Sequence, residues 1–425
     1  MQLNLAIEDL ASDIPLPPLY RVRQCWDTQP LADVAGAVRA QLDAVGLRAQ
    51  ITPGMRVAVT AGSRGIRDMV QILQTSVAWL KEAGAEPFIV PAMGSHGGAT
   101  AAGQVRLLAD LGVTAATMGC PIQATMEVVE LGHLDDGTPV YLDRHAAEAD
   151  GVLVVNRIKP HTSFKADIES GIAKMCAVGL GKRLGAEMVH RRGVVGLRTL
   201  LVPMARMVVS RGKVLAGLAL LEDAREQTAD IVALPPAEIG GAGEAHLLER
   251  SKALMARLPF DQLDVLVVDE IGKNISGTGM DTNVIGRLRI PGEPEPATPR
   301  ITVIVALDLT DAGHGNATGV GLADLIPAQL AQKIDFAATY INNVTSGLIG
   351  LRKGALPMML PTSRAAIATA LRMCGQPDLH AIRLARIPNT LLLEELLVSP
   401  ALLPEVAVHP GLELLGPVEW MGVDE

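Results

Sequence analysis

Short runs of aliphatic and β-branched residues alternate with glycine-rich loops and amphipathic segments along most of the chain. Between Ile66 and Leu80 the apolar positions keep a 3.6-residue period, which predicts a helix. The strands predicted from the short apolar runs are 55–60, 88–92, 152–155, 214–221, 263–269 and 301–307. Because strand, glycine loop and helix recur, we expect an α/β fold with mostly parallel sheets.

The domain organisation follows from the length and from the position of the strand patterns. A chain of 425 residues is long enough for two or three domains. We expect two α/β domains, 1–260 and 261–425, with an active-site cleft between them. Residues 1–30 read as an extended leader with an edge strand around 19–22, and 128–142 as an inserted hairpin.

Composition and charge exclude several classes of protein. The net charge is −9 and the basic residues are scattered, which argues against a nucleic-acid partner. Apolar stretches such as 200–209 contain Pro203 and Arg206, so we expect no membrane span, and the amino terminus lacks the pattern of a secretory signal. The four cysteines show no CxxC spacing. Together these features predict a cytoplasmic protein without a zinc ribbon.

The stretch 152–193 contains several residues that could take part in catalysis or ligand binding. Its apolar strand ends at Asn156, and the loop that follows carries His161 at the strand edge where α/β sheets bind ligands. A straight helix through the remainder would place Lys174 and His190 on nearly opposite faces. Gly179 and Gly181 interrupt the helical pattern, so we expect a bend that brings Lys174 and His190 together.

Other loops after predicted strands carry further candidates. His96 and Arg64 each follow a strand and precede a helix, where an imidazole or a guanidinium could meet an anionic ligand, although both also fit ordinary polar loop positions. Lys159 and its basic neighbours around His161 suit a small anionic substrate, or a loop salt-bridged to Asp167 and Glu169.

Three further features are weaker. Lys273 in the glycine-rich loop 272–279 fits either an anion contact or a solvated charge, and the glycine spacing is neither a P-loop nor GxGxxG. His314 occupies a comparable loop and is expected to be structural. Cys176 lies between apolar neighbours and is expected to be packed and inert.

Taken together, five spaced residues give the chain a resemblance to the lactate racemase family: Arg64, His96, His161, Lys174 and His190. The resemblance implies that Lys174 is the covalent attachment point of a nickel-pincer nucleotide (pyridinium-3-thioamide-5-thiocarboxylic acid mononucleotide) and that His190 ligates the Ni. It also implies that His96 and His161 act as acid and base, and that Arg64 and, more loosely, Lys273 contact cofactor and substrate.

The resemblance implies racemisation or epimerisation of a small anionic 2-hydroxy acid. The C–H bond of such a substrate is barely acidic, so hydride transfer to the cofactor is easier than loss of a proton, and a planar 2-keto acid results. Each direction then needs its own base for the hydroxyl proton. The cofactor-synthesis enzymes are implied as transient partners.

Some positions depart from the family pattern. Ala61 replaces an aspartate, Gly97-Gly98 replace arginine-proline, and the spacing from His161 to Lys174 is longer. These changes point away from lactate itself and toward a different hydroxy acid. Two alternatives remain open: a divalent-metal-dependent hydroxy-acid lyase or dehydratase, and a non-catalytic hydroxy-acid binding protein.

Overall fold

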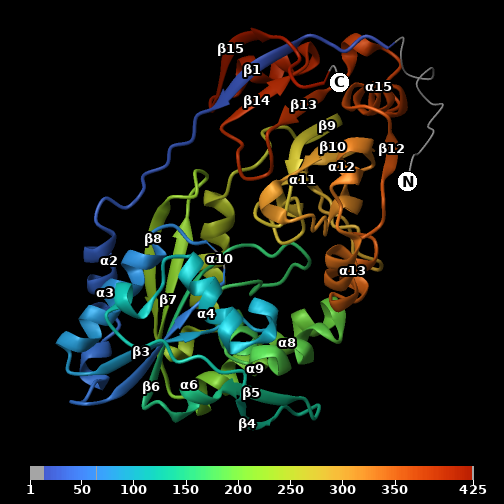
Figure 1. The fold of residues 1–425 in the computed structure, drawn as a ribbon. Helices are drawn as coiled ribbons and strands as arrows, with labels where there is room; N and C mark the ends of the chain where they lie inside the picture. Colours follow the sequence, from blue (N-terminus) through green and yellow to red (C-terminus); the bar gives the residue numbers. More distant parts are fainter. Residues whose placement is uncertain (1–13, 64, 424–425) are drawn as a thin grey trace. The chain divides into compact units, whose positions relative to one another are not determined.

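The computed structural model describes residues 14–63 and 65–423 of the chain, which form two compact units (Figure 1). The N-terminal unit comprises Thr28–Met255, and the C-terminal unit comprises Ala256–Glu425 together with the first residues of the chain up to Asp27. Both units are α/β structures built on mostly parallel sheets, as the sequence predicts.

The N-terminal unit is organised on a five-stranded sheet of order β3-β2-β6-β7-β8. Its strands are β2 (Arg56–Ala61), β3 (Glu86–Pro91), β6 (Gly151–Arg157), β7 (Val214–Glu222) and β8 (Thr228–Leu234). The first four are parallel, and β8 pairs with β7 in the antiparallel sense. β4 (Val128–His133) and β5 (Pro139–Asp143) form the predicted hairpin.

Helices cover both faces of this sheet because successive strand residues point to opposite sides. On one face Val57, Val59 and Leu153 pack in a single core with helices α2 and α3. The helices of the unit are α2 (Val34–Ala44), α3 (Met69–Glu82), α4 (Ala101–Asp110), α5 (Ala115–Met118), α6 (Arg144–Glu148), α7 (Ile172–Lys174), α8 (Lys182–His190), α9 (Gly193–Arg211) and α10 (Ala242–Leu254).

Helix α9 is the long apolar helix that the sequence predicts over 194–210. It runs continuously from Gly193 to Arg211 and includes Pro203. By length and composition this helix is long and apolar enough to cross a membrane, with a mean hydropathy of 1.4. Helix α9 nevertheless packs against α8 and β7, and the core helix of a soluble protein can be as long and as apolar.

The C-terminal unit contains an eight-stranded sheet of order β12-β11-β10-β9-β13-β14-β1-β15. Its strands are β1 (Leu19–Gln24), β9 (Gln262–Ile271), β10 (Arg300–Leu309), β11 (Leu325–Pro327), β12 (Met358–Leu360), β13 (Leu384–Ile387), β14 (Glu395–Val398) and β15 (Leu412–Val418). Its helices are α11 (Thr282–Ile285), α12 (Ala328–Gln332), α13 (Phe336–Thr345), α14 (Leu348–Leu351), α15 (Ser363–Met373) and α16 (Leu403–Val408).

Strand β1 shows where the amino-terminal leader belongs. Tyr20 pairs with Val398 of β14 on one side and with Pro417 of β15 on the other, so β1 is an internal strand and not the expected edge strand. The leader was expected within a domain 1–260, but its described residues form part of the C-terminal sheet. The chain divides between Met255 and Ala256.

Candidate active site

The candidate site of the N-terminal unit lies at the carboxyl ends of three neighbouring parallel strands. Ser63 follows β2, His96 follows β3, and His161 follows β6, and the sheet order β3-β2-β6 makes these strands adjacent. Because parallel strands end at the same edge of a sheet, their loops share this edge, where α/β proteins bind ligands. Arg64, the neighbour of Ser63, lies outside the described residues.

His96 is an exposed residue whose ring is held by Ser63. The Ser63 Oγ and the His96 Nδ1 are 2.5 Å apart, so they share a hydrogen bond. The hydroxyl can donate or accept, and when it accepts from Nδ1 the Nε2 atom of the neutral ring is left as the basic nitrogen. The Gln104 side-chain amide fixes the same loop by donating to the carbonyl oxygens of Gly94 (2.9 Å) and His96 (3.3 Å).

A buried lysine, Lys182, supports the loop that carries His96, and the sequence analysis did not single it out. Lys182 has no exposed surface; its Nζ lies 2.9 Å from Asp143 Oδ2 and 3.0 Å from Gln104 Oε1, and it also donates to the carbonyl oxygen of Pro91. Burial lowers the pKa of Lys182, while Asp143 opposes that change. Lys182 therefore links the end of β3, helix α4 and the start of α8.

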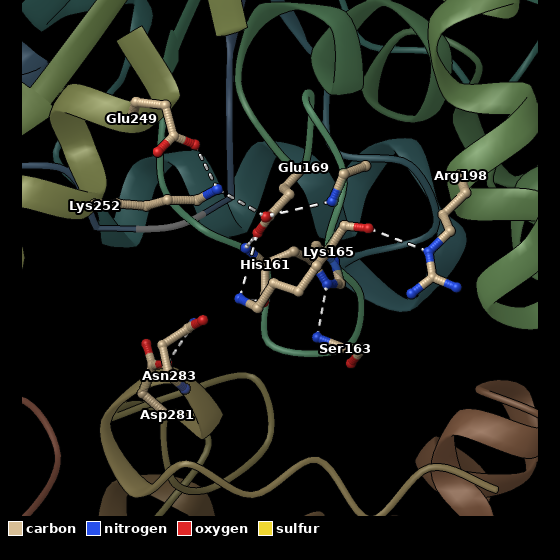
Figure 2. A network of polar contacts seen from close by, with 10 residues as sticks. His161, Ser163, Lys165, Glu169, Arg198, Glu249, Lys252, Asp281 and Asn283 are labelled. Carbon is tan, nitrogen blue, oxygen red and sulfur yellow. Dashed lines mark hydrogen bonds and ion pairs between the residues drawn. The ribbon is translucent and has the colours of Figure 1, made fainter. Parts of the chain in front are cut away.

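The His161 loop is held by a network of polar contacts around Glu169 (Figure 2). The His161 backbone N–H donates to Glu169 Oε2 at 2.8 Å, and the Ser163 N–H donates to His161 Nδ1 at 3.1 Å. Phe164 packs against the imidazole with ring centroids 4.7 Å apart. Since Nδ1 accepts a backbone N–H, the neutral ring carries its proton on Nε2.

Two basic side chains of this loop form ion pairs, one of them with Glu169, a partner that the salt-bridged alternative names. Arg157 forms an ion pair with Glu222, which is itself nearly buried. Lys165 Nζ lies 3.5 Å from Glu169 Oε2. These two residues therefore organise the loop, and neither is a dedicated anion contact in this arrangement.

A turn of the helical segment separates Lys174 from His190. A π-helical turn, Met175–Gly179, follows α7, and α8 begins after it and ends at His190. Burial and the charge of Lys174 lower the pKa of His190 to about 4. The imidazole is therefore neutral at pH 7 and close enough to Lys174 to sense its charge.

The glycines at the bend act through close packing and not through unusual dihedral angles. A Cβ on Gly179 would lie 2.7 Å from the Ala92 carbonyl oxygen, and one on Gly181 would lie 2.5 Å from that of Ala177. Gly181 itself has ordinary helical angles, and the left-handed residue at the bend is Lys182, with φ 52°. The chain thus turns at a buried, ion-paired lysine.

Glu244 holds the turn that precedes Lys174. This buried carboxylate accepts the N–H of Ala173 at 3.0 Å and that of Gly240 at 2.8 Å. Burial raises the pKa of Glu244, whereas these backbone donors oppose the rise. Glu244 belongs to the first turn of α10, so this helix is tied to the lysine turn.

The remaining candidates have structural surroundings. Lys273 lies in the C-terminal unit after β9, where its Nζ donates to Asn342 Oδ1 at 2.7 Å. Cys176 has no exposed surface, and burial together with Glu244 raises the pKa of its thiol far above the ordinary value, which confirms an inert residue. His314 is an exposed left-handed residue in a loop of the same C-terminal unit.

No group of three or more His, Cys, Asp or Glu side chains arranged to hold a metal ion occurs within residues 14–63 and 65–423.

The fold and the site define an α/β protein with two histidines on loops at one edge of its sheet. Residues 16–192 match the model of the lactate racemase N-terminal domain, so this part of the chain is similar to the lactate racemase family. The lactate racemase apoprotein of Thermoanaerobacterium thermosaccharolyticum is similar in fold, with a TM-score of 0.52 at 12% identity over 88% of this chain and 99% of that chain.

A protein of Thermotoga maritima of known crystal structure is a further match, with a TM-score of 0.45 at 15% identity over 66% of this chain and 72% of that chain. The search of curated proteins found no match. The family model ends at residue 192 and so includes His96, His161, Lys174 and His190.

Proposed function

We propose that the protein is a racemase or epimerase of a 2-hydroxy acid that carries a nickel-pincer nucleotide on Lys174. The observation that carries the proposal is the pair of Lys174 and His190, a lysine beside a histidine whose pKa of about 4 keeps it neutral. Neutral imidazole is a good ligand for nickel, and no proton has to leave before it binds the metal.

The residues present fit this cofactor in their donor chemistry. Lys174 is partly exposed and supplies an amine, and His190 supplies one nitrogen ligand at the end of α8. When bound, the nucleotide would supply the acceptor for the hydrogen on C2 of the substrate. The protein's own task is then to orient the hydroxy acid and to move its hydroxyl proton.

We assign proton movement to His96 and His161. With Nδ1 donating to Ser63 Oγ, the Nε2 of His96 can accept the hydroxyl proton. His161 holds its neutral proton on Nε2, so it donates there, and it gains a second proton on Nδ1 only when the Ser163 N–H releases that atom. The two imidazoles have different hydrogen-bond partners, so one can accept and the other can donate the hydroxyl proton. A racemase needs both roles because it works in two directions.

The proposal extends to the substrate and the surroundings. Arg64 and Lys273 are proposed as contacts to the substrate carboxylate, with a small anionic 2-hydroxy acid as ligand. The cofactor-synthesis enzymes are the proposed transient partners, and the cytoplasm is the proposed location. Ala61, in place of the aspartate of the family pattern, favours a hydroxy acid other than lactate.

The test compares variants made together with the cofactor-synthesis enzymes. Lys174→Ala should abolish the covalent adduct, and His190→Ala should lower the nickel content, whereas Arg183→Ala on the exposed face of α8 should change neither. Loaded wild-type protein should racemise at least one member of a 2-hydroxy acid panel by chiral chromatography. Wild-type nickel content in both site variants would contradict the proposal.

A further inference from the structure

Helix α10 holds the segment from Ile158 to Ala173 at three separate points. The Ser251 Oγ donates to the Ile158 carbonyl oxygen at 2.9 Å, at the start of the segment. Glu244 accepts the Ala173 N–H at its end. Between them, Lys252 Nζ lies 3.2 Å from Glu169 Oε1. The helix thus fixes both ends and the middle of the segment that carries His161.

Glu169 is the central group of this arrangement. Its side chain has no exposed surface, and besides the His161 N–H it accepts a long hydrogen bond of 3.5 Å from the Ala166 N–H. A buried carboxylate is strongly destabilising unless it is paired. Lys252 is 23% exposed and Lys165 is 41% exposed, so the shorter and better shielded pairing is the one with Lys252.

Lys252 is suited to this pairing at neutral pH. Burial works against its ammonium, but the carboxylates of Glu249 and Glu169 outweigh that effect and raise the pKa of Lys252. Figure 2 shows Lys252 reaching to Glu169, whose carboxylate also accepts the His161 N–H.

We propose that Lys252 and Glu169 are positioning residues for His161 and that their ion pair sets where the His161 imidazole meets the substrate. This inference rests on the proposed function, in which His161 contacts the hydroxy acid. Neither residue is a catalytic residue, because Glu169 acts through the His161 backbone and Lys252 acts through Glu169.

A positioning role differs from a general contribution to stability because the ends of the segment have their own anchors. Ser251 and Glu244 continue to hold Ile158 and Ala173 when the ion pair is removed. The freed part is then the middle of the loop, where His161 and Ser163 lie. Small displacements of a group that contacts substrate lower turnover strongly.

The first readout is amide hydrogen exchange in protein without cofactor. Lys252→Met keeps the aliphatic stem and removes the charge, so exchange at His161 should accelerate about tenfold or more, while exchange at Ala173 stays as in the wild type. Glu169→Gln should act in the same direction, and Lys252→Arg should restore protection. Arg250→Met is the control, because it removes a surface ion pair between α10 and Asp230 of β8.

The second readout is turnover of the loaded enzyme. Lys252→Met should lower kcat about tenfold or more with nickel content and adduct unchanged, and Lys252→Arg should recover most of kcat. The inference would be overturned if exchange at His161 were unchanged in Lys252→Met, or if Arg250→Met lost as much protection and kcat as Lys252→Met. Faster exchange at His161 with a normal kcat would also overturn it.

The two readouts separate this inference from the proposed function. Hydrogen exchange needs neither cofactor nor substrate, so it decides whether the ion pair holds His161 even when no hydroxy acid is turned over. Absence of turnover in fully loaded wild-type protein would refute the proposed function, whereas unchanged exchange at His161 in Lys252→Met would refute the role of the ion pair.

Discussion

Burial and the neighbouring charge of Lys174 together lower the pKa of His190 to about 4, although a π-helical turn and a bend separate the two residues along the chain. The pair therefore combines an amine with an imidazole that is unprotonated under ordinary conditions. This combination suits a covalently held cofactor whose metal takes one ligand from the protein. The other site residues are held in place by buried charges.

Ser63 should matter for activity and not for stability. Ser63→Ala removes the hydrogen bond to His96 Nδ1 and with it the preference for one tautomer, so kcat should fall about tenfold, equivalent to one hydrogen bond of about 1.4 kcal/mol. Ser210→Ala on α9, whose hydroxyl donates to its own helix, is the matched control. Equal kcat in both variants would remove the role given to Ser63.

Glu244 should make folding stability depend on pH. Burial raises its folded-state pKa above 4.5, so the folded protein binds this proton more tightly than the unfolded chain does. The contribution of Glu244 to the free energy of unfolding should therefore fall as pH rises from about 4.5 through the raised pKa. Urea unfolding of Glu244→Gln at pH 4 to 8 should show a flatter profile than the wild type, whereas Glu187→Gln on the surface should match the wild type.

Lys182 should be a large contributor to stability through Asp143. Lys182→Met leaves a fully buried carboxylate without its counter-charge, so the free energy of unfolding should drop by about 3–5 kcal/mol. Asp143→Asn keeps the oxygen that caps α6 and should be milder. The double variant should lose less than the sum of the two single losses, and strictly additive losses in urea unfolding would show that the two charges do not interact.

The cysteines give a simple check on the burial of the site helix. Cys25 is exposed, whereas Cys120, Cys176 and Cys374 are buried. Burial also raises the pKa of Cys176 and suppresses its thiolate. A thiol reagent should modify Cys25 in the folded protein and the other three only after unfolding, as peptide mass mapping would show. Rapid labelling of Cys176 would contradict the packing of the turn after Lys174.

Much of the fold and part of the site follow from local patterns. The strands β2, β3, β6 and β9 were expected near their observed bounds because apolar runs followed by glycine loops mark buried parallel strands. The placement of His96 and His161 at one sheet edge follows from the same rule. The antiparallel strand β8 was missed, since alternation is weak in its sequence.

The supporting charges could not be predicted in this way. Glu169, Lys182, Glu244 and Lys252 read as ordinary charges of loops and helices, which usually face solvent. Their burial depends on packing between segments far apart in the chain, such as α10 against the loop after β6. The pairing of β1 with β14 and β15 likewise joins opposite ends of the chain, and no local pattern indicates it.

The most direct test of the central claim is the mass and nickel content of the intact protein made together with the pincer-synthesis enzymes, followed by peptide mapping around Lys174. The account predicts a nucleotide-sized adduct on Lys174 and nickel close to one ion per chain. Unmodified Lys174 in the presence of functional synthesis enzymes would contradict the account.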